Sequence, residues 1–180
     1  MSGQHCHVAQ QLSARELESE RLLLEPLRAD HADELAPVLG DVALHRFIGG
    51  TPPGAAELRE RFARQARGHS PDGRERWLNW VVRDRATGLA VGTVQATVVT
   101  AAQLGELAWV IGSAHQGRGY AKESAALVTS WLRGQGVLDL RAHIHPEHVA
   151  SAAVARAIGL HPTAVMKDGE TRWESALQEP

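Results

Sequence analysis

A glycine-rich segment separates a β-like run from a long amphipathic run in the second half of this chain. Residues 105–112 read GELAWVIG, which is typical of a strand, and residues 119–134 read GYAKESAALVTSWLRG. Apolar residues of the second run recur at spacings of four, three and four, which places them on one face of a helix: Ala121, Ala125, Val128 and Leu132. A chain with this strand, turn and helix combines helices with a sheet.

In the first hundred residues, turn and capping residues separate the predicted elements at similarly regular intervals. The patterns predict four elements before residue 70: a strand within 19–27, a helix over 31–40 with Asp30 as its N-cap, a loop over 45–54 and an amphipathic helix over 55–68. Two β-rich runs follow at 77–84 and 88–99. The intervening RATG has the composition of a hairpin turn.

The last forty residues predict a strand, a helix and a hairpin. Residues 137–145 alternate, and one side of this strand carries Leu138, Leu140, Ala142 and Ile144. A helix of small residues follows over 150–158, closed by Gly159, and residues 161–177 suggest a terminal hairpin. The order β-α-α-β-β-β-α-β-α-β-β predicts an α/β fold of the α+β type, with one mixed sheet.

Length and charge limit the class of protein. The 180 residues are 43% hydrophobic, which favours one domain with a real core over residues 16–180, after a flexible or loosely docked tail over residues 1–15. The formal net charge of −2 argues against nucleic acid or a membrane surface as the main partner. Cys6 is the single cysteine, and neither a secretion signal nor a membrane-length apolar run is evident, so we expect a cytoplasmic protein.

The glycine-rich turn leaves N–H groups at the start of the following helix uncovered. These groups lack intrahelical partners, and the helix dipole adds positive charge there. Gly117 and Gly119 lack the Cβ atoms that would hold a phosphate away, and Arg118 adds a fixed charge. This chemistry suits a diphosphate, although a tight bend with positive φ explains the same glycines. The segment matches neither the dinucleotide spacing G-x-G-x-x-G nor a P-loop.

The segment QGRGYA resembles the Q/R-x-x-G-x-G/A signature of the GNAT N-acetyltransferase superfamily through Gln116, Gly119 and Ala121. The similarity covers about residues 17–178, and the opening ESERLLLEPL resembles that of the RimJ/RimL-like branch. This resemblance implies the GNAT fold, a central mixed, mostly antiparallel sheet flanked by about four helices. It also implies that the strand at 105–112 splays away from the strand at 137–145.

The resemblance further implies acetyl-CoA as the cofactor. Its pyrophosphate would lie on the N–H groups of residues 117–121, and its pantetheine arm would pair with backbone groups that the splayed strands leave free. A backbone N–H near Ile111 or Gly112 would donate to the oxygen of the thioester carbonyl. The implied cofactor-binding residues are Trp109, Val110, Ile111, Gly112, Gln116, Gly117, Arg118, Gly119, Tyr120, Ala121, His148 and Ser151.

Proton transfer requires two further groups, for which the sequence offers Glu106 and Ser151. An amine with a pKa of about 10.4 is protonated at pH 7, and the neutral form costs roughly 4 to 5 kcal/mol, so we expect a base near it. Glu106 shares a strand face with Ala108 and Val110, and many relatives carry glutamate here; the alternative is a surface ion pair. Ser151 matches the serine of the family's N-x-x-S pattern and could protonate the leaving thiolate, or serve only as a helix cap.

Two positions depart from the family pattern. Many GNAT enzymes use a tyrosine at or after the helix over 150–158, whereas the one tyrosine here, Tyr120, lies in the glycine-rich turn. His148 stands in the place of the pattern's asparagine, and its imidazole could bind a pantetheine amide or transfer a proton. His143, His145 and His148 could instead hold zinc, but only Glu147 offers a fourth ligand, so we expect no metal.

The resemblance also places the amine acceptor between the first two helices, the strand at 105–112 and the last hairpin. Residues expected to face the acceptor are His45, Arg46, Phe47, Trp77, Trp80 and Trp173. The tryptophans suit either an apolar pocket wall or the core. The charges form no patch that would select among a peptide N-terminus, a polyamine, an aminoglycoside and an amino acid.

The resulting hypothesis is an acetyl-CoA-dependent N-acetyltransferase that acts on a primary amine by direct attack in a ternary complex. One alternative is a module that binds acyl-CoA without turnover. Another is a transferase for a larger acyl group, such as succinyl-CoA. A homodimer through the terminal strands is compatible with this branch of the superfamily.

Overall fold

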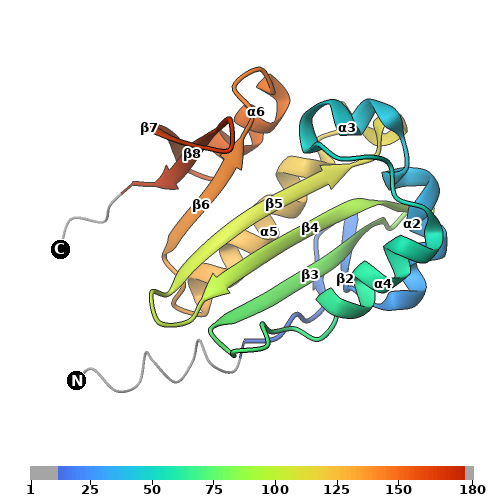
Figure 1. Cartoon of the computed structure of the whole chain (residues 1–180), viewed down its shortest axis with the longest axis horizontal. Coiled ribbons are helices and arrows are strands. Elements are labelled where there is room, and N and C mark those ends of the chain that lie inside the picture. The colour runs from blue at the N-terminus through green and yellow to red at the C-terminus, as the bar shows by residue number, and fades with distance from the viewer. Residues whose placement is uncertain (1–11, 177–180) are drawn as a thin grey trace.

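Eight strands form one mixed sheet with helices on both faces (Figure 1). The computed structural model describes residues 12–176, with the backbone alone at Ile48. The strand order is β1-β2-β3-β4-β5-β6-β8-β7, and every neighbouring pair is antiparallel except β5–β6, which confirms the predicted sheet. The strands are β1 (Leu17–Glu18), β2 (Leu22–Pro26), β3 (Glu75–Asp84), β4 (Ala90–Val99), β5 (Leu104–Ile111), β6 (Asp139–Ile144), β7 (Leu160–Lys167) and β8 (Glu170–Ser175).

Two hydrophobic clusters hold the helices against the sheet. The helices are η1 (Ala29–His31), α2 (Ala32–Leu39), α3 (Val42–Ile48), α4 (Ala55–Gln65), η2 (Ser113–His115), α5 (Tyr120–Gly134) and α6 (Val149–Ala157). The larger cluster joins α5 and α6 to one face through residues such as Val128, Leu132 and Val154. The smaller cluster joins α2 and α4 to the other face through Leu35 and Phe62. The layers therefore follow from the apolar stripes of the amphipathic helices.

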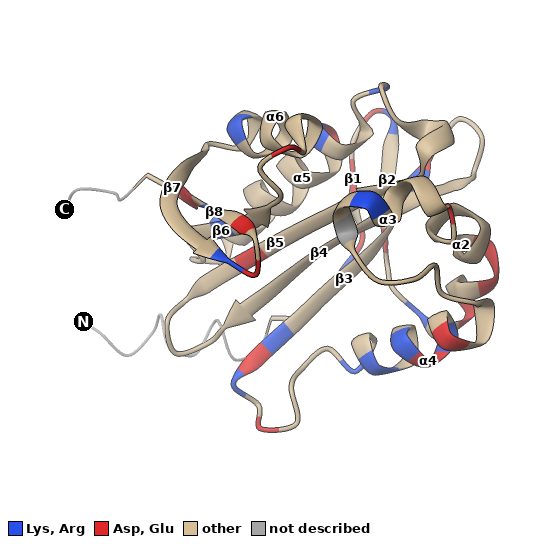
Figure 2. Cartoon of the chain, turned by 45° about the horizontal axis from the view of Figure 1, so that its top comes forward, with Lys and Arg blue, Asp and Glu red and all other residues tan. Residues whose placement is uncertain are grey.

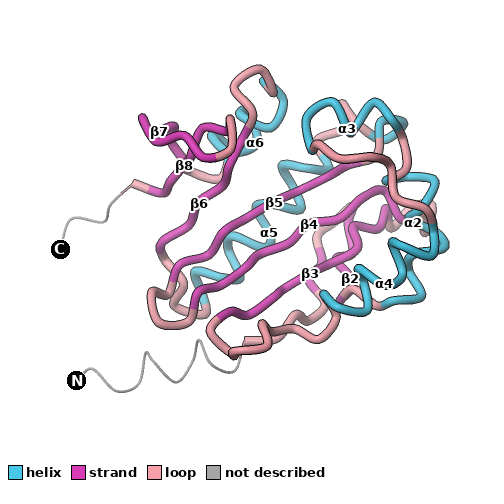
Figure 3. The backbone as a smooth tube through the Cα atoms, viewed as in Figure 1, coloured by secondary structure: helices cyan, strands magenta, loops and turns pink. Residues whose placement is uncertain are grey.

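The parallel pair β5–β6 is short. Its register covers only Leu104 with Asp139, Gly105 with Leu140 and Glu106 with Arg141. Beyond these pairs the two strands diverge, as Figure 3 shows. A parallel connection needs a crossover, and α5 supplies it on the face of the larger cluster. The predicted splaying of the two strands is thus present.

Three local predictions were wrong. Asp30 is not a helix N-cap, because it lies inside η1, whose N-cap is Arg28. The predicted loop over 45–54 begins as a helix, because the Asp41 side chain accepts a hydrogen bond from the Ala43 N–H and caps α3. Leu138 is 47% exposed although it matches the alternation, because it precedes β6 rather than lying within it.

Part of the predicted N-terminal tail is packed. Leu12 is buried in the larger cluster, and Ala14 packs against it. The Trp80 indole donates a 2.7 Å hydrogen bond to the Arg15 carbonyl. The tail therefore does not include residues 12–15, while residues 1–11 lie outside the described part of the chain. No helix among residues 12–176 is long and apolar enough to cross a membrane.

Two leucines of the same predicted face provide a test of the β6 boundary. Leu140 is 1% exposed and Leu138 is 47% exposed. We expect Leu140→Ala to lower the free energy of unfolding by about 2 to 5 kcal/mol, because it leaves a cavity in the core. Leu138→Ala should change it by less than about 1 kcal/mol. Urea unfolding of the two variants measures both values, and similar losses would contradict the boundary.

Candidate active site

The turn between β5 and α5 adopts the conformation that its glycines allow. Gly117 and Gly119 have φ angles of 76° and 82°, so both lie in the left-handed region that disfavours other residues. Gly119 is the N-cap of α5, and no side chain caps this helix. The N–H groups of the first turn of α5 therefore remain available, in the place where the helix dipole favours an anion.

Arg21, which directly precedes β2, holds this turn in place. Its Nη1 donates a 3.0 Å hydrogen bond to the Arg118 carbonyl, and its guanidinium lies 5.4 Å from the centre of the Tyr120 ring. The same guanidinium forms an ion pair with Glu123, which also accepts a hydrogen bond from Ser19. The chain segment before β2 thus fixes a turn nearly one hundred residues away.

The outer edge of β5 is open beyond Glu106. The Gly112 N–H donates to the Val91 carbonyl, so the N–H groups of even-numbered residues in β5 face β4. Those of Trp109 and Ile111 then face the gap beside β6, outside the paired stretch. Gln116 Nε2 donates a 2.9 Å hydrogen bond to the Ile111 carbonyl, which occupies the last acceptor of this edge.

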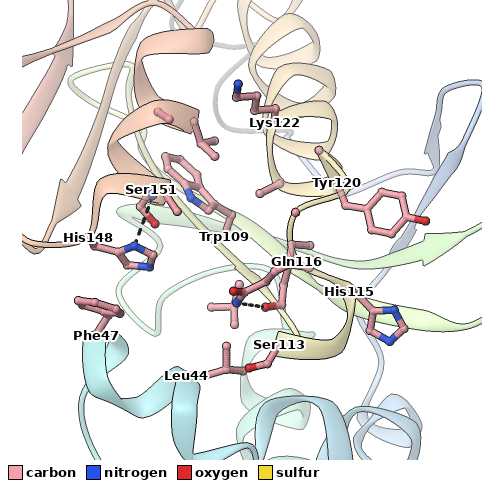
Figure 4. Close-up of a pocket in the computed structure, with 18 of the residues that line it drawn as sticks. Leu44, Phe47, Trp109, Ser113, His115, Gln116, Tyr120, Lys122, His148 and Ser151 are labelled. Carbon is pink, nitrogen blue, oxygen red and sulfur yellow. Dashed lines mark hydrogen bonds between the residues drawn. The ribbon is translucent and has the colours of Figure 1, made fainter.

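A cavity of about 510 Å³ lies between this open edge, the turn and α6 (Figure 4). The predicted cofactor residues that line it are Trp109, Val110, Ile111, Gln116, Gly117, Gly119, Tyr120, Ala121, His148 and Ser151. Phe47 of α3 closes one side, where its ring stacks on His148 with centroids 4.2 Å apart. The cavity is therefore built largely from the residues that the glycine-rich segment indicated.

A second cavity, of about 240 Å³, opens between the diverging strands. It shares Phe47, Trp109, Val110, His148 and Ser151 with the first. Glu106 of β5 and Glu170 of β8 contribute its carboxylates, and no lysine or arginine is among the described residues that line it. The second cavity therefore has negatively charged side chains in its lining, whereas the first has the N-terminus of α5 with its positive dipole end.

His148 caps α6 through its imidazole. Nδ1 accepts a hydrogen bond from the Ser151 N–H at 3.4 Å, which is the role of asparagine at a helix N-cap. An accepting Nδ1 carries no proton, so the neutral ring bears its hydrogen on Nε2. Burial, and then the nearby His145, lower the pKa of His148 below its ordinary value. His148 therefore favours the neutral state that the cap requires.

Comparison with known proteins identifies the family. Residues 21–161 match the family model of the acetyltransferase (GNAT) domain. The chain belongs to the GNAT acetyltransferase family. No curated protein shows significant sequence similarity to it.

Solved structures share the fold of this acetyltransferase at low sequence identity. The acetyltransferase from Agrobacterium tumefaciens strain C58 is 23% identical, with a TM-score of 0.73 over 92% of this chain and 96% of that chain. RimL, a ribosomal L7/L12 alpha-N-protein acetyltransferase solved with coenzyme A, is 15% identical, with a TM-score of 0.74 over 89% and 97%. AAC(6')-Ib, solved with paromomycin and acetyl-CoA, is 11% identical, with a TM-score of 0.73 over 88% and 94%. The predicted GNAT fold is thereby confirmed.

The GNAT acetyltransferase is an acetyl-CoA-dependent N-acetyltransferase, and its larger cavity fits this acyl donor. The uncapped N-terminus of α5 offers N–H groups to a diphosphate, at a turn whose glycines leave no side chain in the way. The free N–H groups of Trp109 and Ile111 match the amides of a pantetheine arm. Both parts of the donor therefore have suitable partners in the acetyltransferase.

Three of the expected cofactor residues of the acetyltransferase lie outside both cavities or have another contact. Arg118 and Gly112 do not line either cavity, and the Gly112 N–H is already bonded to the Val91 carbonyl, so it is not free for a bound ligand. The Tyr120 ring points away from the cavity in Figure 4, and its hydroxyl donates to Asp84 at 2.8 Å. This hydrogen bond lowers the pKa of Asp84.

Most residues expected to face the acceptor are structural instead. Trp80 and Trp173 are buried in the larger cluster, because large apolar rings gain most from full burial. Trp77 donates to Glu75, and it lines neither cavity. The two ring nitrogens of His45 lie 3.0 Å from the Gly49 and Leu39 carbonyls, and only Phe47 of this set lines the cavities. Arg46 has its guanidinium 5.2 Å from the Phe47 ring, outside both linings.

The sequence missed residues on both sides of the site. Ala43 and Leu44 line the larger cavity from α3, and Glu170 lines the smaller one from β8. The signal for α3 was present, because Asp41 precedes an apolar run in the manner of an N-cap. Within residues 12–176, no three histidine, cysteine, aspartate or glutamate side chains are grouped to hold a metal ion.

Replacing Arg21 tests whether it positions the phosphate-binding turn. We expect Arg21→Gln to weaken coenzyme A binding about ten-fold, or roughly 1.4 kcal/mol, because the Arg118 carbonyl and Glu123 lose their partner. The matched control is Arg74→Gln, since the Arg74 side chain is exposed and contacts Asp72 only through an ion pair. Calorimetric titration gives both affinities, and equal values would contradict this role.

The cap of α6 predicts a pH dependence of stability. Because the folded protein lowers the pKa of His148, the cap contributes fully above pH 6.5 and weakens as the pH falls from 6.5 through the lowered value. His148→Asn keeps a capping acceptor that does not titrate. We expect the free energy of unfolding of the variant, relative to that of the wild type, to rise by up to about 1 kcal/mol as the pH falls from 8 to 5. Urea unfolding along this range would show parallel curves if the cap did not titrate.

Proposed function

We propose that this acetyltransferase moves the acetyl group of acetyl-CoA to a primary amine by direct attack in a ternary complex. The observation that carries the proposal is the junction of the two cavities at the fork between β5 and β6. The larger cavity has donors for a diphosphate and a pantetheine arm, and the smaller one has a carboxylate for an amine. Their shared residues bring the two substrates together without a covalent enzyme intermediate.

Glu106 is proposed as the base. Its side chain is 44% exposed and lines the smaller cavity, at the last residue pair before the strands diverge. An ammonium group bound there can transfer a proton to the carboxylate, directly or through water, before it attacks. The carboxylate thereby accepts the proton that the amine must lose before it attacks, a loss that costs roughly 4 to 5 kcal/mol for a free amine at pH 7.

The proposed route for the remaining charges uses the backbone and Ser151. The N–H of Ile111 or Trp109 donates to the oxygen of the thioester carbonyl, where negative charge develops. Ser151 lines both cavities, and within the described residues its hydroxyl has no hydrogen-bond partner. The hydroxyl is thus available to donate a hydrogen bond to the sulfur of the departing thiolate.

The acceptor is proposed to be a cationic amine without a neighbouring carboxylate. Glu106 and Glu170 give the smaller cavity its charge, which attracts an ammonium group and repels the carboxylate of a free amino acid. A peptide N-terminus, a polyamine and an aminoglycoside satisfy this condition. RimL is named for protein N-terminal acetylation, and the structure of AAC(6')-Ib contains an aminoglycoside, so this fold accommodates both classes.

A thiol-release screen with acetyl-CoA tests the proposal. The probes are peptides that begin with Ser, Ala or Met, the polyamine spermidine, the aminoglycoside kanamycin, and free amino acids. We expect release with at least one of the first three classes and little with free amino acids. Release with succinyl-CoA but not acetyl-CoA would support a larger acyl group. Coenzyme A binding without release would instead support a binding module.

The role of Glu106 predicts a specific kinetic defect. We expect Glu106→Gln to lower kcat by about 10² to 10⁴ at pH 7, the usual contribution of a general base. Coenzyme A affinity should stay within about two-fold of the wild type, because Glu106 does not line the larger cavity. The control is Glu170→Gln, which removes a carboxylate from the same cavity without touching the fork. An unchanged kcat for Glu106→Gln would refute the base assignment.

A further inference from the structure

A histidine on the opposite side of the fork contacts the proposed base. His143 of β6 has its Nδ1 atom 3.3 Å from Oε1 of Glu106, and its side chain is only 11% exposed. We infer that His143 is a positioning residue that orients the Glu106 carboxylate toward the acceptor amine. This inference rests on the proposed function, in which Glu106 is the base.

The backbone explains why these two side chains meet. Glu106 belongs to the last residue pair of the parallel ladder, opposite Arg141, and His143 follows two residues later on the same face of β6. At this point β5 and β6 begin to separate, and although the backbone of Glu106 stays paired with Thr97 of β4, no ladder bond joins β5 to β6 beyond it. A side chain from β6 that reaches back across the gap supplies the missing constraint.

Neighbouring cations do not compete for Glu106. Arg141 and Arg172 flank His143 on the sheet, but their guanidinium groups lie 3.4 and 2.9 Å from the carboxylate of Glu174. Within residues 12–176, His143 is the only side chain in ion-pair range of Glu106. An arginine at this distance would make a carboxylate a weaker base, whereas a neutral imidazole orients it without adding a full charge.

The orientation requires one tautomer of His143. A neutral imidazole donates from one nitrogen only, so donation to Oε1 places the hydrogen on Nδ1. Oε1 is then engaged, and Oε2 remains for the proton of the acceptor amine. In this structure the two atoms lie 3.3 Å apart without the alignment of a hydrogen bond, and such contacts commonly shorten and align when the substrate binds. His148 has the opposite arrangement, because its Nδ1 accepts from the Ser151 N–H.

This contrast allows a test that needs no acceptor. Long-range proton–nitrogen NMR correlations of the full chain at pH 8 report the tautomer of each histidine, and the His143→Asn and His148→Asn spectra assign the two signals. We expect hydrogen on Nδ1 for His143 and on Nε2 for His148. Hydrogen on Nε2 of His143 would overturn the inference, because that ring could not donate to Glu106.

Kinetics of matched variants test the consequence for catalysis. Asparagine places its amide donor near the position of Nδ1, whereas glutamine places it near Nε2. We expect His143→Gln to lower kcat about ten- to a hundred-fold, the effect of misplacing a reacting group, and His143→Asn to stay within about three-fold of the wild type. The rate is measured with acetyl-CoA and whichever peptide, polyamine or aminoglycoside probe above reacts fastest. The KM for acetyl-CoA should not change, because His143 lines only the smaller cavity.

A double variant separates this inference from the proposed function. If His143 acts through Glu106, adding His143→Gln to Glu106→Gln should lower kcat by no more than about two-fold further. Independent losses, or equal activity of the Asn and Gln variants, would overturn the positioning role. If Glu106→Gln alone has no effect, the base assignment itself fails. If it lowers kcat and His143→Gln does not, only the present inference fails.

Discussion

Parallel pairing between β5 and β6 stops at Glu106 and Arg141, and beyond this point each strand follows different neighbours. β5 stays in the ladder with β4 as far as Ile111, whereas β6 continues beside β8. The edge of β5 that faces the gap then carries N–H groups that have no ladder partner among residues 12–176, which is costly unless water or a ligand satisfies them. The same divergence makes room for both cavities. The sites proposed for the acyl donor and for the acceptor thus have one structural cause.

The anion-binding turn depends on a second, longer-range set of contacts. Gly117 and Gly119 allow its backbone conformation but cannot enforce it, since glycine is the least restricted residue. Arg21 and Tyr120 supply the restraint, and Asp84 at the end of β3 anchors the tyrosine hydroxyl. The one tyrosine of the chain is therefore engaged in holding the turn. Charged residues of both signs are interspersed elsewhere, for example along α4 in Figure 2.

The sequence predicted the donor side of the site far better than the acceptor side. Gly117, Gly119 and the apolar face of α5 follow local rules, so the turn and its helix could be placed from spacing alone. The family signature added the splayed strands and Glu106. Trp80 and Trp173 could not be assigned in this way, because composition does not say which aromatic rings enter the core. The contact between His143 and Glu106 joins two strands that α5 separates in sequence, and no local pattern encodes it. Residues 1–11 of the predicted tail lie outside the described part of the chain.

The two cavities share walls from α3, β5 and α6 but differ in the other elements that line them. The turn and α5 line only the larger cavity, while β6 and β8 line only the smaller one, which is proposed for the acceptor. Substitutions in the terminal hairpin could therefore alter which amine is accepted while the coenzyme-binding turn stays intact. Because of this division, a change of amine selectivity requires substitutions in one segment only, and the turn and α5 can stay the same.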